Sequence, residues 1–240
     1  MKKSNISVAL FLLMSSHNSV MALPLNDNYL LETNLAITSN YLSNGASVTH
    51  GKPALQLTSF LFHVPTGLYG GIWGTNFDVG APADREIGGY IEINKYFSEK
   101  FSIDTSIGKF LYEDYSALNT IESNTKISYD KFYVNYIYDW LKSPLPDAEF
   151  RYLGFKSELP KSFWIDAAVG FHDLHSRDLD PILDGKYNSY SLTVGKHVNE
   201  NIDTSFMFSN TNLNDFDCAY ASGYAGQCGS TLVITLDYKF

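Results

Sequence analysis

Positive charge, cysteine and long apolar runs are all scarce in this chain of 240 residues. Asp and Glu number 26 against 17 Lys and Arg, so the formal net charge is −9. Arginine occurs only at Arg85, Arg151 and Arg177. Because an excess of acid repels phosphate, the composition disfavours a nucleic-acid partner and offers no basic patch for anionic lipid headgroups.

Patterns that would indicate a helical membrane protein or a cofactor-dependent enzyme are also missing. No segment after the N-terminal region approaches the ~20 consecutive apolar residues of a membrane-spanning helix. Leucine-rich helical heptads, a phosphate-binding loop, a zinc-ligand pattern and a dinucleotide fingerprint are all absent. We therefore expect no cofactor and no metal. Aromatic residues are plentiful instead, at 15% of the chain with 17 Tyr and 16 Phe.

The first 22 residues have the pattern of a secretory signal peptide. Lys2 and Lys3 precede an apolar run over residues 6–14, and small side chains at Val20 and Ala22 fit cleavage after Ala22. The run is too short for a membrane anchor, and no Cys lies at the expected cleavage point of a lipoprotein. We expect residues 1–22 to be removed on export and residues 23–240 to form one domain.

Two cysteines, Cys218 and Cys228, lie close together in a glycine-rich stretch near the C-terminus. In an exported chain such a pair is expected to form a disulfide. Closing so short a loop stabilises a protein by ~2–3 kcal/mol in the chain-entropy model. A metal site is less favoured, because no further Cys or His is near in sequence.

Apolar and polar residues alternate from residue 31 onward in segments of about ten residues, the period of a strand with one apolar face. Tight connections at 64–67, 98–100, 160–162 and 199–201 alternate with long ones at 42–53, 80–86, 113–129, 173–188 and 211–229. Short turns at one end and long loops at the other are typical of outer-membrane β-barrels. The segments are 31–41, 54–62, 68–79, 87–97, 101–111, 131–140, 151–159, 163–171, 190–198, 202–210 and 232–240.

The final segment has the clearest alternation. Its polar positions are Thr235, Asp237 and Lys239, and its apolar positions are Leu232, Ile234, Leu236, Tyr238 and Phe240. An apolar strand face needs no protein cover where it meets lipid, and this ending resembles the C-terminal insertion signal of bacterial outer-membrane barrels. We expect it to be recognised by the barrel-assembly machinery. A plain edge strand is the alternative.

A count of eleven strands is inconsistent with such a barrel. Counted from the N-terminus, residues 131–140 run toward the periplasm, and counted from the C-terminus, residues 151–159 run the same way. Successive antiparallel strands cannot do so, and a single-chain bacterial barrel has an even number of strands. The sequence therefore predicts an all-β, transmembrane, antiparallel up-and-down β-barrel of twelve strands, with ten as the alternative. We place the missing strand near residues 138–150, where Pro144 and Pro146 obscure it.

Four short segments carry a pattern shared with a known family. Residues 39–47 read SNYLSNGAS, residues 67–78 read GLYGGIWGTNFD, residues 158–160 read ELP before a strand, and residues 187–195 read YNSYSLTVG. With the cysteine pair before the last strand, they resemble the TorF-type porins, bacterial outer-membrane proteins of largely unassigned function. Asn40 stands where that family usually has Asp, and Gly74-Thr75 replaces a small residue followed by Ser. The resemblance implies an outer-membrane barrel and supplies no catalytic residues and no solute.

The best candidate for hydrolytic chemistry lies in residues 171–180, FHDLHSRDLD. His172 and His175 with Ser176 or Asp173 would fit a barrel lipase, deacylase or protease. A solvated polar loop is the simpler interpretation, because a spacing of three puts the two His on opposite faces of a strand. A Ca²⁺ site at the nearby aspartates is disfavoured, since Pro181 interrupts them. We expect no enzyme.

The interior of the barrel is where a function is expected. If the apolar faces point outward, five polar residues point inward and are candidates to line a pore: Glu92, Asp104, Asn135, Asp166 and Asp203. An acid-lined pore favours cations. The sequence thus predicts a porin-like outer-membrane channel for passive diffusion of small hydrophilic solutes, with a possible preference for cations. Alternatives are a narrow barrel filled by its own side chains, and a non-conducting barrel whose outer loops bind a surface partner. Oligomeric state is left open.

Overall fold

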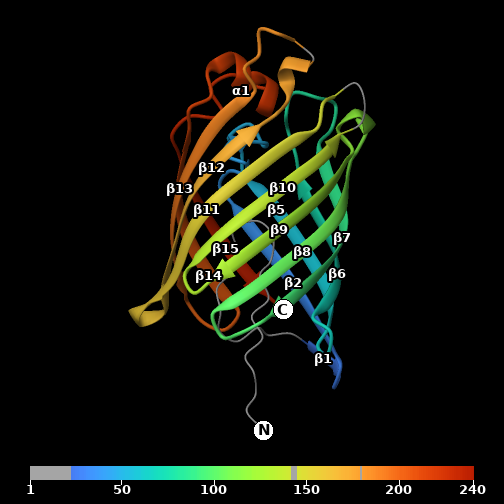
Figure 1. Ribbon diagram of the computed structural model, residues 1–240, viewed down its shortest axis with the longest axis vertical. Coiled ribbons are helices and arrows are strands. Elements are labelled where there is room, and N and C mark those ends of the chain that lie inside the picture. The colour runs from blue at the N-terminus through green and yellow to red at the C-terminus, as the bar shows by residue number, and fades with distance from the viewer. Residues whose placement is uncertain (1–22, 142–144, 179) are drawn as a thin grey trace.

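A computed structural model describes residues 23–141, 145–178 and 180–240. The predicted signal peptide, residues 1–22, lies outside the described residues. The chain forms a closed antiparallel barrel in which each strand pairs with the next and β15 returns to pair with β2 (Figure 1). The twelve strands are β2 (Tyr29–Thr38), β5 (Ala54–His63), β6 (Leu68–Asn76), β7 (Arg85–Tyr96), β8 (Phe101–Tyr112), β9 (Thr120–Tyr129), β10 (Phe132–Leu141), β11 (Ala148–Leu159), β12 (Phe163–Asp173), β13 (Lys186–His197), β14 (Ile202–Thr211) and β15 (Thr231–Lys239).

The remaining elements are short and belong to the connections. Strand β1 (Leu23–Asn26) pairs with β2 beyond the end of β15, and β3 (Leu42–Ser43) pairs with β4 (Ala46–Ser47) between β2 and β5. The helical elements are η1 (Ser116–Leu118), η2 (Pro160–Ser162), η3 (Ser176–Asp178) and α1 (Asp215–Ser222). Among the residues described, no helix is long and apolar enough to cross a membrane.

The predicted twelve strands are confirmed, but the missing strand was placed wrongly. It is β9, within residues 113–129 that we expected to be a loop, and not near residues 138–150. Outward-facing Ile121 and Ile127 on β9 are separated by Ser123 and Thr125, so the apolar period is diluted. A two-residue turn containing Asp130, which has a positive φ of 55°, joins β9 to β10.

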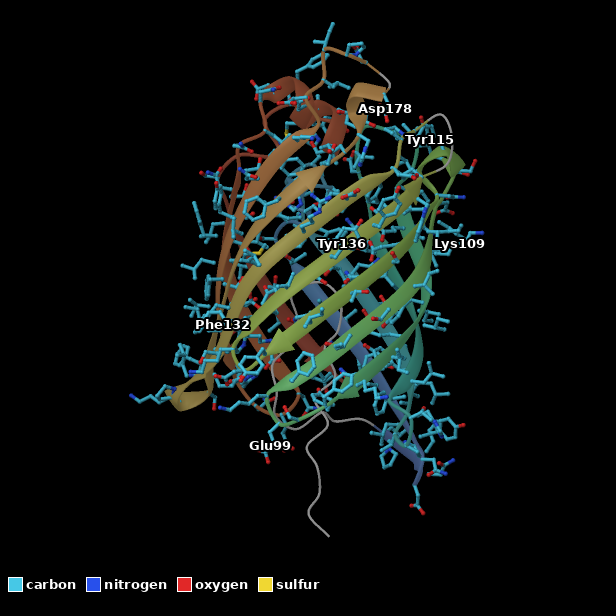
Figure 2. All side chains as sticks on the ribbon, viewed as in Figure 1. Glu99, Lys109, Tyr115, Phe132, Tyr136 and Asp178 are labelled. Carbon is cyan, nitrogen blue, oxygen red and sulfur yellow. A yellow bond between two sulfur atoms is a disulfide. The ribbon has the colours of Figure 1, made fainter. Side chains whose placement is uncertain are left out.

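Connections of two lengths separate the ends of the barrel, as the sequence predicted. The C-terminus lies at the end with the short turns, and α1 lies at the end with the long loops (Figure 1). Figure 2 shows Glu99 at the short-turn end and Asp178 at the long-loop end. The short connections are residues 64–67, 97–100, 130–131, 160–162 and 198–201.

The outer wall is apolar over its whole circumference. Large hydrophobic side chains on alternate strand positions are exposed, such as Ile72, Ile91 and Ile234. Phe132 and Tyr136 project outward from β10 (Figure 2). The opposite face of each strand carries buried polar and charged residues. This arrangement is the reverse of a water-soluble barrel and is that of a barrel whose wall meets lipid.

Candidate functional site

The five residues predicted to line a pore lie on the inner face of the barrel, in the half nearer the short turns. Glu92 is only 2% exposed, while Asp104, Asp166 and Asp203 are also buried and Asn135 is half-buried. They come from five different strands, β7, β8, β10, β12 and β14. The alternation of the strands alone determines this placement.

Three of the four acids, Asp104, Asp166 and Asp203, have a hydrogen-bonded polar neighbour within the lumen. Asn94 donates a hydrogen bond to Asp104, and the Tyr133 hydroxyl donates to Asp166 over 2.9 Å. Asp203 accepts from Lys239 Nζ at 2.8 Å and contacts His197 Nδ1 at 2.7 Å. Such paired groups avoid the free-energy penalty of an isolated buried charge.

Three inward lysines were not among the residues predicted to line a pore. Lys126 lies with its ammonium 4.3 Å from the centre of the Tyr133 ring, and Lys156 lies 5.4 Å from that of Trp164. Lys239 is the partner of Asp203. Alternation placed Lys239 on the polar face of the last strand and would have placed Lys156 on that of β11, but Lys126 belongs to the strand that was missed.

A second group of acids lies in the half nearer the long loops. Glu122 and Asp139 are directly opposite each other on β9 and β10. Glu86 accepts from Trp73 Nε1 at 2.9 Å. The three acids line a cavity of about 120 Å³, and among the described residues no Lys or Arg lines it with them. The missed strand again explains why Glu122 was overlooked.

Two further cavities lie toward the ends of the lumen. A cavity of about 270 Å³ lies beneath α1 at the long-loop end, and one of about 280 Å³ opens at the short-turn end. Ser43 and Asn44, from the β3–β4 hairpin, line both the outer cavity and the 120 Å³ cavity at the acids. The hairpin therefore stands between the long-loop mouth and the middle of the lumen.

The residues suspected of hydrolytic chemistry do not assemble. His172 Nε2 lies 2.7 Å from Ser189 Oγ, but its Nδ1 is buried without a hydrogen-bond partner among the described residues. His175 is in the following loop, with its Nε2 3.7 Å from Glu149. A Ser–His–Asp triad needs an acid that orients the imidazole, and this His172 has none in the part of the chain described. Within that same part, no group of three or more His, Cys, Asp and Glu is placed to hold a metal ion.

The predicted disulfide is present at the long-loop end. Cys218 and Cys228 are both buried, with their Cα atoms 5.8 Å apart. The bridge closes a loop that carries α1, an element the sequence analysis did not predict. Asn214 caps this helix by accepting from the backbone N–H of Phe216 and Asp217. Gly223 ends it in the left-handed conformation with φ 79°.

An apolar wall around a polar and charged interior defines a β-barrel of the type that spans the bacterial outer membrane. Over residues 25–240 the chain matches the model of a family described as "Bacterial protein of unknown function (Gcw_chp)", and it belongs to that family.

Solved structures share this fold at low sequence identity. A KdgM porin in complex with disordered oligogalacturonate has 9% identity and a TM-score of 0.56, with 88% of this chain and 98% of that chain covered. A NanC porin has 8% identity and a TM-score of 0.54, with 87% and 97% covered. No curated protein matches the sequence. Identities this low indicate a common fold and do not define a solute.

Proposed function

We propose that this protein is a porin-like channel that passes small hydrophilic solutes by passive diffusion, with a preference for cations. The observation that carries the proposal is the charge of the inner wall. Three lysines, Lys126, Lys156 and Lys239, face nine acids, which are Glu32, Glu86, Glu92, Asp104, Glu122, Asp139, Asp166, Asp203 and Asp237. Fixed acids along a narrow water-filled path raise the local concentration of cations and exclude anions.

The fold and the sequence motifs support a channel rather than an enzyme. The two solved structures described above are both named porins. The TorF-type motifs lie at the candidate channel: Tyr41, from one motif, packs against Trp73, from another, with ring centroids 6.1 Å apart. We propose further that this chain is a member of the TorF-type porins. In this assignment the long-loop end faces the outside and the short-turn end faces the periplasm.

Neutralising two of the inward acids tests the charge argument. We expect Glu92→Gln combined with Asp104→Asn to reduce the cation preference, because both side chains are buried in the lumen. The measurement is the reversal potential in planar bilayers under a KCl gradient. Asp114→Asn serves as the control, since Asp114 is an exposed loop residue whose positive φ of 59° suits Asn. An unchanged reversal potential in the double variant would contradict the role of these acids.

The filled long-loop mouth favours one alternative, a non-conducting barrel whose outer loops bind a surface partner. In that case the lumen charges serve only to hold the wall together. Bilayer recordings separate the two functions, because a non-conducting barrel gives no current above background at any voltage. Silence of a properly folded protein in the membrane, both in the wild type and in a variant lacking residues 41–49, would replace the channel proposal by this alternative.

A further inference from the structure

The β3–β4 hairpin crosses the long-loop mouth from one wall to the other. It leaves the barrel at the end of β2, and its tip meets β11 and β13. The Tyr152 hydroxyl donates to the Asn44 side chain, and the Tyr187 hydroxyl donates to the Asn44 carbonyl over 3.0 Å. Four strands separate β2 from β11 in one direction around the barrel and six in the other, so the two walls are nearly opposite.

The tip also approaches the barrel wall at a third point. Gly45 has a φ of +89°, and a Cβ at this position would lie 2.6 Å from Thr211 Cγ2 and 3.1 Å from Ser189 Cβ. Only glycine fits this backbone conformation at so close an approach. The hairpin thus reaches β14 as well as β11 and β13, and its tip contacts the wall opposite β2.

Internal hydrogen bonds make the hairpin a rigid unit. Asn40 Oδ1 accepts from Ser47 Oγ at 2.6 Å and from Thr49 Oγ1 at 3.1 Å. Ser47 and Thr49 are 0% and 1% exposed. On its apolar side, Tyr41 and Val48 pack in one cluster with Trp73, Phe77, Ala54 and Ala83 of the barrel and its neighbouring loop. A loop with this many specific contacts has one preferred position.

The loop closed by the Cys218–Cys228 disulfide lies against the hairpin. Ala46 packs on both half-cystines, and the Ser47 backbone N–H donates to the Gln227 carbonyl over 2.9 Å. The whole connection between β14 and β15, residues 212–230, is called the disulfide loop here; it includes α1 and covers the outer cavity.

A second set of contacts joins the two loops through Asp78. Lys52 Nζ, on the returning arm of the hairpin, lies 2.8 Å from the Asp78 carboxylate. The Tyr224 hydroxyl, from the disulfide loop, donates to the same carboxylate over 2.7 Å. The His50 ring stacks on Tyr224 with centroids 3.7 Å apart. The base of the hairpin is thereby fixed to the disulfide loop.

We propose that the β3–β4 hairpin is a plug that closes the channel at its outer mouth, and that the disulfide-closed loop is the latch that holds the plug in place. Solute passes only when the tip leaves Tyr152 and Tyr187 and uncovers the acid-lined cavity below it. This inference rests on the proposed channel function, because a plug requires a pathway to close. It differs from a fixed constriction in requiring that open and closed states exchange.

Weakening the tip contacts tests the plug. Single-channel recordings compare the wild type with Tyr152→Phe combined with Tyr187→Phe, which removes only the two hydroxyl groups. We expect the fraction of time spent open to rise several-fold, while the conductance of the open state stays the same. The matched control is Tyr136→Phe combined with Tyr190→Phe, since both of these tyrosines are exposed on the outer wall. The control should behave as the wild type does.

The latch is tested by Cys218→Ser combined with Cys228→Ser, which should raise the open fraction in the same way. Dithiothreitol should then raise the open fraction of the wild type and leave this variant unchanged. An open fraction in the double Ser variant equal to that of the wild type would overturn the latch.

A variant with residues 41–49 replaced by a short glycine–serine linker separates failure of the plug from failure of the channel. We expect it to be permanently open. If the wild type conducts as fully as this variant, the plug is wrong and the channel stands. If the variant is correctly folded, as judged by heat-modifiable electrophoretic mobility, and remains silent, the channel function is wrong and the plug falls with it.

Discussion

At the scale of single residues, the charged groups of the lumen are organised by pairing. Asp203 between Lys239 and His197, and Asp166 beside Tyr133, show how acids are accommodated on the inner wall of a lipid-facing barrel. Removing one partner leaves the other buried without compensation, which destabilises more than removing both. Conservative changes such as Glu→Gln and Asp→Asn are therefore the appropriate probes of selectivity.

Asp78 joins the hairpin to the disulfide loop through its carboxylate. Hydrogen bonds from Lys52 and Tyr224 hold the pKa of its carboxyl at about 2, below the ordinary value of 3.8. Because this pKa is lowered in the folded state, the contact contributes stability that is fully present above pH 3.8 and is lost as the pH falls through about 2. The contacts of Asp78 with Lys52 and Tyr224 should therefore weaken as the pH falls from 3.8 to about 2.

Hydrogen–deuterium exchange of residues 47–52, corrected for the intrinsic rate at each pH, measures this loosening. We expect exchange in the wild type to be slow at pH 5 and several-fold faster at pH 2.5. Asp78→Asn should exchange rapidly at both values, because it has no charge to lose. Asp114→Asn, in an exposed loop, should follow the wild type. Equal protection of the wild type at both pH values would contradict the assigned role of Asp78.

At the scale of strands, the outer face of β15 requires apolar side chains, because it meets lipid. Ile234 is about half exposed near the middle of the strand. A lysine placed at mid-depth on the lipid face of such a barrel destabilises it by about 2–4 kcal/mol. We expect Ile234→Lys to have an effect of this size, measured by reversible urea unfolding in lipid vesicles. Ile182→Lys, at a loop position that is 79% exposed, should change the unfolding free energy by much less.

The end of the same strand tests the predicted assembly signal. We propose that Phe240 is recognised by the barrel-assembly machinery during insertion. Phe240→Ala should then lower the amount of folded barrel in the outer membrane several-fold, as measured by heat-modifiable mobility of membrane fractions. Phe97→Ala, at another exposed aromatic of the short-turn end, is the control. An equal yield from both variants would refute a special role for the terminal residue.

Strand alternation predicted most of the strands that form the barrel wall. It predicted only part of what lies inside the barrel. Period-two patterns are local, so they revealed eleven strands, and they failed at β9, where serine and threonine occupy lipid-facing positions. The hairpin gave no such signal. Asn44 meets residues 108 and 143 positions away, and no local pattern encodes contacts of that separation. The disulfide was predictable because its two cysteines are close in sequence.

At the scale of the whole molecule, the features combine into a lipid-embedded barrel with an acid-rich interior and a closed outer mouth. The apolar wall determines where the protein resides, since the large hydrophobic side chains exposed at alternate strand positions are suited to lipid. The excess of acids over lysines inside is the basis for the proposed cation preference. The hairpin lines both the outer cavity and the cavity at the acids, and the disulfide loop lines the outer one.

The reversal potential of the wild-type protein in a planar bilayer, with a tenfold KCl gradient across it, tests the central claim most directly. An acid-lined channel predicts a potential of the sign set by K⁺, and its magnitude should fall when Glu92 and Asp104 are neutralised. A potential of the sign set by Cl⁻ would contradict the proposed function of the lumen.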